Sequence, residues 1–296
     1  MDAPPKGYLA AIVERRLDVT PDLAVFWLRS PEPLAFRPGQ YVTLAAPNAS
    51  GRVVKRAYSV VSAPHEPLVE LVIELVEEGE MTPLLWPLRE GDTVWVRKKV
   101  VGHFLLDAER TCHVMACTVT GIAPFLSMIR AHAASLAAGE TVPDHRFLVV
   151  HGASHAVEFG QYLDELATLA ETGWVEAVST VSRPWADAAW TGEVGRVEDV
   201  VRKHLDRLAW EPDAVAGYAC GNPQMIETVR GILRRARVDD AHVHEEKYFT
   251  VGEAGTPAEA PTPAPAAAFK RPPVLPGRGP GSVVLKTAPR PKRPSE

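Results

Sequence analysis

Cysteine is scarce in this sequence: among 296 residues only Cys112, Cys117 and Cys220 occur. Their spacing fits neither a disulfide framework nor a metal knuckle. A common iron–sulfur cluster needs four thiolates, so the chain cannot build one unaided. The histidines also lack the spacing of metal ligands, and we expect no metal site.

Long apolar runs are missing as well. The first residues, Met1 to Lys6, lack the apolar core of a signal peptide, and no stretch is long enough to span a bilayer. With 46% hydrophobic and 23% charged residues, the composition is ordinary for a globular protein. We therefore expect a cytoplasmic monomer that binds neither a membrane nor nucleic acid.

What is present divides the chain into three parts, the first of which covers residues 1–108. A chain of 296 residues can hold two domains with cores of their own. Short extended runs separated by Pro and Gly favour a β-barrel in this first part. The alternation from Leu68 to Glu77 predicts a half-buried strand, and another strand is expected from Thr93 to Lys99. Between them, Thr82 and Pro83 predict the N-cap and the first position of a short helix.

Residues 109–249 form the second part, in which strands alternate with helices as in a parallel sheet with crossover helices. We expect its strands near 113–118, 146–151, 174–181, 213–219 and 241–248. Residues 250–296 are rich in Pro and Ala, carry few large apolar side chains and should be disordered. This basic tail either docks an acidic partner or is a solubilising extension.

Two clusters in the first part suit a ring cofactor that carries phosphate. The run Arg56-Ala57-Tyr58-Ser59 brings together a cation that pairs with phosphate, a ring that stacks on a flat heterocycle, and a hydroxyl. The same residues could equally be ordinary surface and core residues of a barrel. The turn Gly79-Glu80-Met81-Thr82 precedes a helix, where backbone N–H groups attract an anion, as they do before any helix.

Four further clusters follow strands of the second part, where doubly wound folds bind nucleotides. They are Cys117 to Phe125 with its turn at Gly121, Ser182-Arg183 with Arg196, Cys220-Gly221, and Glu245 to Phe249. The two arginines could hold an extra phosphate, and a glycine lets a ring approach the backbone closely. Each cluster also has a plain structural interpretation, as a turn, a solvated arginine, a buried thiol or a terminal strand.

Taken in this order, the six clusters resemble the ferredoxin-NADP reductase family, in its bacterial single-flavin branch, over residues 8–249. The resemblance implies a Greek-key FAD-binding β-barrel, then a five-stranded parallel NADP-binding α/β domain, with FAD and NADP(H) as cofactors. It implies FAD contacts from Arg56, Ala57, Tyr58, Ser59, Ile73, Glu80, Met81, Thr82, Thr120, Tyr248 and Phe249. It implies NADP contacts from Thr120, Gly121, Ser182, Arg183, Arg196, Cys220 and Gly221, and catalytic roles for Ser59, Cys220 and Glu246.

The sequence departs from the family pattern at three places. The nucleotide loop commonly reads T-G-T-G-I-A-P, and here Val119 replaces the first glycine; a β-branched residue disfavours positive φ and crowds a phosphate. Ser154 stands where many relatives have arginine, so one phosphate contact is missing. Many family members end near the last aromatic residue, whereas this chain continues for 47 residues after Phe249.

The resemblance predicts a ferredoxin-NADP reductase that moves electrons between NADP(H) and a one-electron carrier. Because the chain cannot build its own cluster, the carrier would be a separate ferredoxin or flavodoxin. Two alternatives stay open. One is the reductase component of an oxygenase or another electron-transfer complex. The other is a non-catalytic flavoprotein scaffold, in which Val119 and Ser154 have removed nucleotide turnover.

Overall fold

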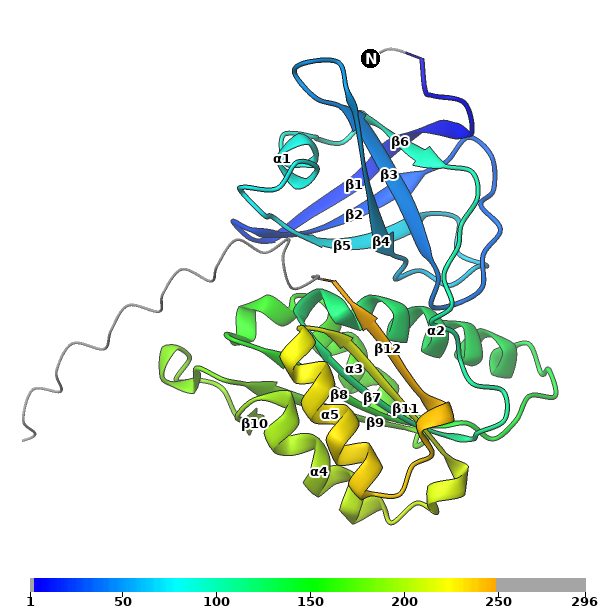
Figure 1. Cartoon of the computed structure of the whole chain (residues 1–296), viewed down its shortest axis with the longest axis vertical. Helices are drawn as coiled ribbons and strands as arrows, with labels where there is room; N and C mark the ends of the chain where they lie inside the picture. The colour runs from blue at the N-terminus through cyan, green and yellow to red at the C-terminus, as the bar shows by residue number, and fades with distance from the viewer. Residues whose placement is uncertain (1–2, 249–296) are drawn as a thin grey trace, which may run out of the picture. The chain divides into compact units, whose positions relative to one another are not determined.

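The first part of the chain forms an antiparallel sheet of six strands in a computed structural model, which describes residues 3–248 (Figure 1). Its elements are β1 (Tyr8–Thr20), β2 (Leu23–Arg29), β3 (Tyr41–Pro47), β4 (Val53–Ser59), β5 (Val69–Glu74), the short helix α1 (Thr82–Leu85) and β6 (Thr93–Arg97). The spatial order is β4-β3-β6-β1-β2-β5, and the end strands β4 and β5 also contact each other. The sheet therefore closes as the predicted barrel.

The second part forms a parallel sheet in the order β10-β9-β8-β7-β11-β12. Its strands are β7 (Cys112–Thr118), β8 (Arg146–Ala153), β9 (Val175–Val181), β10 (Glu193–Val194), β11 (Val215–Gly221) and β12 (Val243–Lys247). The α-helices between them are α2 (Ala123–Ala137), α3 (Tyr162–Ala170), α4 (Val197–Leu208) and α5 (Pro223–Arg235). Short 3-10 turns are η1 (Val119–Ile122), η2 (Ala156–Phe159), η3 (Pro184–Ala186), η4 (Pro212–Ala214) and η5 (Asp240–His242). The five predicted strands are confirmed, and β10 adds a sixth of two residues.

The chain order of the strands reverses beside β7, which lies between β8 and β11. In doubly wound sheets such a reversal leaves a crevice at the carboxyl ends of the strands, where ligands bind. The carboxyl end of β7 leads into η1 and then α2. The predicted nucleotide loop therefore stands at the switch point of the sheet.

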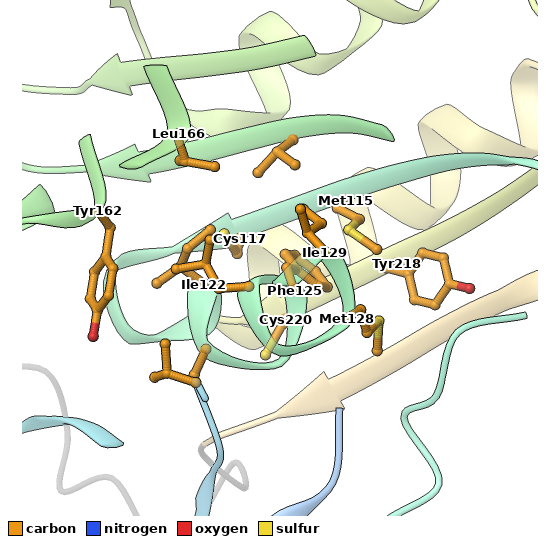
Figure 2. Close-up of a cluster of buried hydrophobic side chains, with 14 of the residues drawn as sticks. Met115, Cys117, Ile122, Phe125, Met128, Ile129, Tyr162, Leu166, Tyr218 and Cys220 are labelled. Carbon is orange, nitrogen blue, oxygen red and sulfur yellow. The ribbon is translucent and has the colours of Figure 1, made fainter. Parts of the chain in front are cut away.

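Alternating side chains on these strands build two cores. One face of the sheet packs against α4 and α5, for example through Val114 and Leu148. The other face, seen in Figure 2, packs Met115 and Tyr218 against Phe125 of α2 and against α3. Barrel residues such as Val25 and Val72 belong to this second core. Burial of apolar surface on this face therefore also stabilises the contact between the barrel and the parallel sheet.

β5 corrects one expectation, because it is buried on both faces rather than on one. Val69, Leu71 and Ile73 belong to the barrel core, as the alternation predicts. On the opposite side Val72 belongs to the core shared with α2, and Glu70 is only 2% exposed. Alternation identifies a strand, but it does not reveal a second layer that covers the polar face.

The start of α1 differs from its prediction. Met81 is the N-cap, and Thr82 is already helical. The Thr82 hydroxyl accepts from the backbone N–H of Val76 at 2.9 Å and donates to the Val76 carbonyl at 3.0 Å. It therefore fixes the preceding turn instead of capping the helix.

Two other features bear on the predictions. No helix within residues 3–248 combines the length and apolar character needed to cross a membrane. The predicted domain boundary at residue 108 falls between β6 and β7 and stays a prediction. The predicted disordered tail, residues 250–296, lies outside the described residues.

Candidate functional site

β4 presents the Arg56–Ser59 cluster at one end of the barrel sheet. Arg56 and Ala57 are exposed, Tyr58 is half-buried against the barrel core, and Ser59 is buried. Burial raises the pKa of the Tyr58 phenol, against an opposing effect of the Arg56 charge. Tyr58 therefore stays a neutral hydroxyl beside an exposed cation.

Ser59 reaches the second sheet, where it meets two other predicted catalytic residues. Its hydroxyl donates to Glu246 Oε2 at 2.9 Å, and the Cys220 thiol donates to the same oxygen at 3.9 Å. Cys220 and Glu246 are register partners on β11 and β12. Two side chains far apart in the sequence, Ser59 and Cys220, thus meet at one carboxylate oxygen of a third, Glu246.

Burial sets the protonation of this group. It raises the pKa of the Glu246 carboxyl, although the hydrogen bonds from Ser59 and Cys220 lower it in part. It also raises the pKa of the Cys220 thiol, and the Glu246 charge raises it further. Cys220 is therefore a thiol rather than a thiolate, and Glu246 is a carboxyl that takes up a proton more readily than an exposed one.

Tyr248 lies next to this group. Its hydroxyl donates to the Thr120 carbonyl at 3.4 Å, and its ring packs on the core that contains Cys220. Burial raises the pKa of the Tyr248 phenol. The structure therefore brings Thr120 and Tyr248 together beside Cys220, whereas Phe249 lies outside the described residues.

Val119 adopts the positive φ that its β-branched side chain disfavours. Its φ is 40°, and its carbonyl is 2.9 Å from Nε2 of the buried His151. Burial lowers the pKa of His151 to about 4, so the ring is neutral near pH 7 and donates from Nε2. Apolar contacts of the Val119 side chain with two cores add to this bond. Tertiary contacts thus hold the loop in the shape that a glycine adopts freely.

The nucleotide loop also packs directly on the turn after β11. A Cβ on Gly121 would lie 2.5 Å from the Cys220 carbonyl oxygen, and a Cβ on Gly221, whose φ is +125°, would lie 2.5 Å from Thr118 Oγ1. Real side chains do not tolerate such distances, so glycine is required at both positions. The closeness keeps Cys220 beside the start of α2.

Ser182, Arg183 and Arg196 lie at the carboxyl edge of the sheet. β9 ends at Val181, whose register partner Val194 shortly precedes Arg196, the N-cap of α4. Arg183 is exposed and makes no ion pair with any of the described residues. Arg196 is 4.0 Å from Glu198. Two guanidinium groups thus stand at this edge of the sheet, and their contact with an extra phosphate stays a prediction.

Other predicted FAD contacts have side chains occupied elsewhere. Ile73 and Met81 are in the barrel core, with 2% and 1% exposure. Glu80 forms an ion pair with Arg52. A contact of Ile73 or Met81 with a cofactor would have to use the backbone, and these assignments stay predictions.

The residues present fit FAD in one respect that the structure itself supplies. Tyr58 Oη is buried and has no hydrogen-bond partner among residues 3–248. A buried hydroxyl without a partner costs about 1–3 kcal/mol. The hydroxyl and phosphate groups of FAD would provide the missing partner beside the Arg56 charge.

Two groups that support the loop and the barrel–sheet contact are not predictable from the sequence. His151, which donates to the Val119 carbonyl, lies in no metal-ligand pattern, and the sequence gives no other indication of a role for it. The alternation of β5 puts Glu70 on the face opposite Val69, Leu71 and Ile73, which a half-buried strand leaves to solvent, yet Glu70 pairs with Arg130 of α2. A charged residue near the start of a largely apolar strand gives little indication of this pair, because its partner is 60 residues away.

A barrel with a cofactor-binding strand, joined to a parallel sheet with a nucleotide loop, defines a two-domain flavin and nicotinamide-nucleotide oxidoreductase. Comparison with known families agrees. Residues 10–104 match the oxidoreductase FAD-binding domain, and residues 115–231 match the oxidoreductase NAD-binding domain. The chain is therefore an oxidoreductase that binds FAD and NAD(P).

Within that class, the chain belongs to the flavodoxin/ferredoxin-NADP reductase family. It is 31% identical over 199 residues to the flavodoxin/ferredoxin-NADP reductase of Escherichia coli, which covers 65% of this chain and 77% of that protein. A ferredoxin NADP+ reductase from Neisseria gonorrhoeae, solved with FAD and NADP, aligns with a TM-score of 0.70 and 26% identity over 82% of this chain and 99% of that one. The reductase component of a phenol 2-monooxygenase from Pseudomonas is 27% identical over 84% of this chain and 66% of that protein.

Proposed function

We propose that this chain transfers electrons between NADP(H) and a separate one-electron carrier, ferredoxin or flavodoxin, by way of FAD. One observation carries the proposal: Ser59 of the barrel and Cys220 of the nucleotide sheet both donate to Glu246 Oε2. The predicted flavin contact and the predicted nicotinamide contact thus share one oxygen atom.

The chain's residues orient the reaction and supply a proton site, while the cofactor supplies the chemistry. When bound, FAD accepts a hydride from the nicotinamide and releases its electrons one at a time. Glu246 can hold a proton on its carboxyl group, because burial raises its pKa, and the hydrogen bonds from Ser59 and Cys220 to Oε2 fix its orientation. Tyr248 packs on the core around Cys220, so it has to move aside before a nicotinamide ring reaches that thiol.

Arg183 supports a preference for NADP over NAD. It is exposed at the carboxyl end of β9, and its backbone N–H donates to the Ser154 carbonyl at 3.1 Å. The guanidinium group can pair with a 2'-phosphate, which NAD lacks. Arg196 would be a second contact, weakened by its own Glu198.

The separate carrier follows from the cysteine count. Three buried thiols cannot ligate a four-cysteine cluster, so electrons must leave to another protein or to a small acceptor. The relatives in Escherichia coli and Neisseria are named for ferredoxin or flavodoxin. A cytoplasmic monomer that docks such a carrier is part of this proposal.

Anaerobic stopped-flow reduction of the FAD-loaded protein tests the proposal. NADPH should bleach the flavin absorption much faster than NADH does. Arg183→Leu should reduce this preference about 10- to 100-fold, through loss of about 1.5–3 kcal/mol of charged hydrogen bonding. Arg202→Leu, on the exposed side of α4, is the matched control and should change neither rate. A protein that stays colourless with added FAD would refute the proposal.

A role as the reductase component of an oxygenase is the second candidate. The similarity to the phenol 2-monooxygenase component favours it, because that match covers more of this chain than the Escherichia coli reductase does. NADPH-dependent cytochrome c reduction distinguishes the two. Strong stimulation by added ferredoxin or flavodoxin supports the first candidate, and indifference to both carriers favours a dedicated oxygenase partner.

A further inference from the structure

A buried carboxylate, Glu70, joins the barrel to the nucleotide sheet. It is the second residue of β5 and is 2% exposed. Its Oε2 accepts from Arg130 Nη1 at 2.7 Å, and its Oε1 accepts from Gln161 Nε2 and from the Tyr162 hydroxyl, both at 2.9 Å. Burial and the charge of Glu70 raise the pKa of the Tyr162 phenol, so Tyr162 keeps its proton and is the hydrogen-bond donor to Glu70. Both oxygens of Glu70 are therefore satisfied by the second sheet's helices and their flanks.

Arg130 is the centre of this network on α2. Its Nε and Nη2 donate to the two oxygens of Glu165 at 2.6 and 2.8 Å, a bidentate pair, while Nη1 turns to Glu70. Burial lowers the pKa of Arg130, but the bonds to Glu165 and Glu70 raise it by more, so the guanidinium stays charged. A planar group held on both edges has one orientation.

A second polar link lies beside the first. The Ser127 hydroxyl of α2 donates to the Ser62 carbonyl at 2.8 Å, and the Ser62 hydroxyl accepts from the Glu70 backbone N–H at 3.1 Å. Ser62 follows Ser59 by three residues, on the segment that leaves β4. α2 is therefore bonded both to β5 and to the chain that follows the predicted flavin strand.

α2 also begins at the nucleotide loop. Ser127 is six residues and Arg130 nine residues after Gly121, which at the rise of an α-helix is about 9 and 14 Å. Apolar contacts across the same face, such as those of Val72 with its neighbours in the shared core, attract without specifying direction. The hydrogen bonds of Glu70 and Ser127 are directional, so they help to fix the distance and angle between α2 and the barrel.

We propose that Glu70 and Arg130 are positioning residues that set the approach of the nicotinamide to the flavin. This inference rests on the proposed function. Hydride transfer needs reacting atoms about 3–3.5 Å apart, and a displacement of about 1 Å can slow a reaction 100-fold. The network touches none of the predicted nucleotide contacts, so it acts on the reaction geometry and leaves nucleotide affinity unchanged.

Glu70→Gln tests this inference, with Glu66→Gln as the matched control. Gln retains the shape of Glu70 but loses its charge. Glu66 Oε2 lies 3.5 Å from the same guanidinium, and the Glu66 side chain is 30% exposed. Loss of the Glu66 charge should therefore matter little. In Glu70→Gln we expect the limiting rate of flavin reduction by NADPH to fall about 10- to 100-fold and the Kd for NADP+ to stay within about twofold. The charge-transfer absorbance of the NADP+ complex should also weaken.

A second variant and a readout on the flavin-free protein guard against a folding artefact. Tyr162→Phe removes one hydrogen bond without changing charge, and should lower the limiting rate several-fold at unchanged Kd. In flavin-free Glu70→Gln, amide hydrogens of α2 should exchange faster than in the control. If Glu70→Gln fails to fold, Tyr162→Phe decides alone.

The outcomes separate this inference from the proposed function. If the wild-type protein is reduced by NADPH and both variants match it in rate, the positioning role is wrong and the proposed function stands. A weaker Kd at an unchanged limiting rate would likewise refute the positioning role. If NADPH does not reduce the wild-type flavin at all, both are overturned.

Discussion

The backbone at Val119 predicts that glycine is more stable than alanine at this position, the reverse of the usual order. Val119 has a φ of 40°, in the left-handed region. That region costs an L-residue about 1–2 kcal/mol, and glycine enters it freely. In the native loop, the hydrogen bond from His151 and the packing of the isopropyl group offset this strain.

Two substitutions at this position separate strain from packing. Val119→Ala and Val119→Gly both remove the branched methyls, but only Ala keeps the Cβ that is strained at positive φ. In ordinary helices and strands Ala is more stable than Gly by about 0.5–1 kcal/mol. At positive φ the order reverses, and we expect Val119→Gly to be more stable than Val119→Ala by about 1 kcal/mol.

Urea unfolding of both variants at one fixed FAD concentration measures this difference in the free energy of unfolding. Ala123→Gly is the control, because Ala123 has a φ of −50° at the start of α2. There glycine should be less stable than alanine. If Val119→Ala equals or exceeds Val119→Gly in stability, residue 119 does not have the positive φ described, and the role given to His151 is wrong.

Four further predictions follow from the same structure. Ala209→Gly should raise the free energy of unfolding by about 0.5–1 kcal/mol, measured by urea unfolding, because Ala209 ends α4 at a φ of 47°. Asp107 accepts hydrogen bonds from two histidines and from a backbone N–H; these outweigh the effect of burial and lower its pKa to about 2. The ionised Asp107 therefore stabilises the fold above its unfolded pKa of about 3.9. The wild type should lose this contribution, about 1–2 kcal/mol, as the pH falls from about 4 to about 2. Asp107→Asn should lack it at neutral pH, which acid unfolding of both proteins measures. Glu246→Gln should slow flavin reduction by NADPH about 10-fold, because the proton site is lost. The same variant should have a higher Tm than the wild type at pH 8. Burial raises the pKa of Glu246, so ionising this carboxyl destabilises the wild-type fold as the pH rises. Ser154→Arg should tighten NADP+ binding about 10-fold in calorimetry and leave NAD+ binding unchanged. The Ser154 carbonyl accepts from the backbone N–H of Arg183, so an arginine at position 154 would stand beside Arg183 and could pair with the same 2'-phosphate.

The long strands could be predicted because their causes are local. Each predicted strand of the parallel sheet overlaps an observed one, since runs of buried apolar residues bounded by turns leave few other structures. β10 could not be predicted in this way. It has only two residues and exists because Val194 pairs with Val181 at the edge of the sheet.

Glu70 and Val119 show where local rules fail. Alternation assigns Glu70 to solvent, but Arg130, Gln161 and Tyr162 meet it from positions 60 to 92 residues away. Propensity excludes positive φ at Val119, but a buried imidazole and two apolar cores impose it. In both cases tertiary contacts outweigh a preference of about 1–2 kcal/mol, which no single-sequence pattern contains.

The candidate site follows from sheet register more than from any motif. Cys220 is the register partner of Cys117 on one side and of Glu246 on the other, so the loop after β7 and the end of β12 are brought to the same thiol. The barrel supplies the remaining member, Ser59, from a strand end that contacts the same carboxylate. Each motif alone has an ordinary structural explanation. The proposed chemistry needs the ends of β4, β11 and β12 to meet at one oxygen, so the angle between the barrel and the parallel sheet should control the rate.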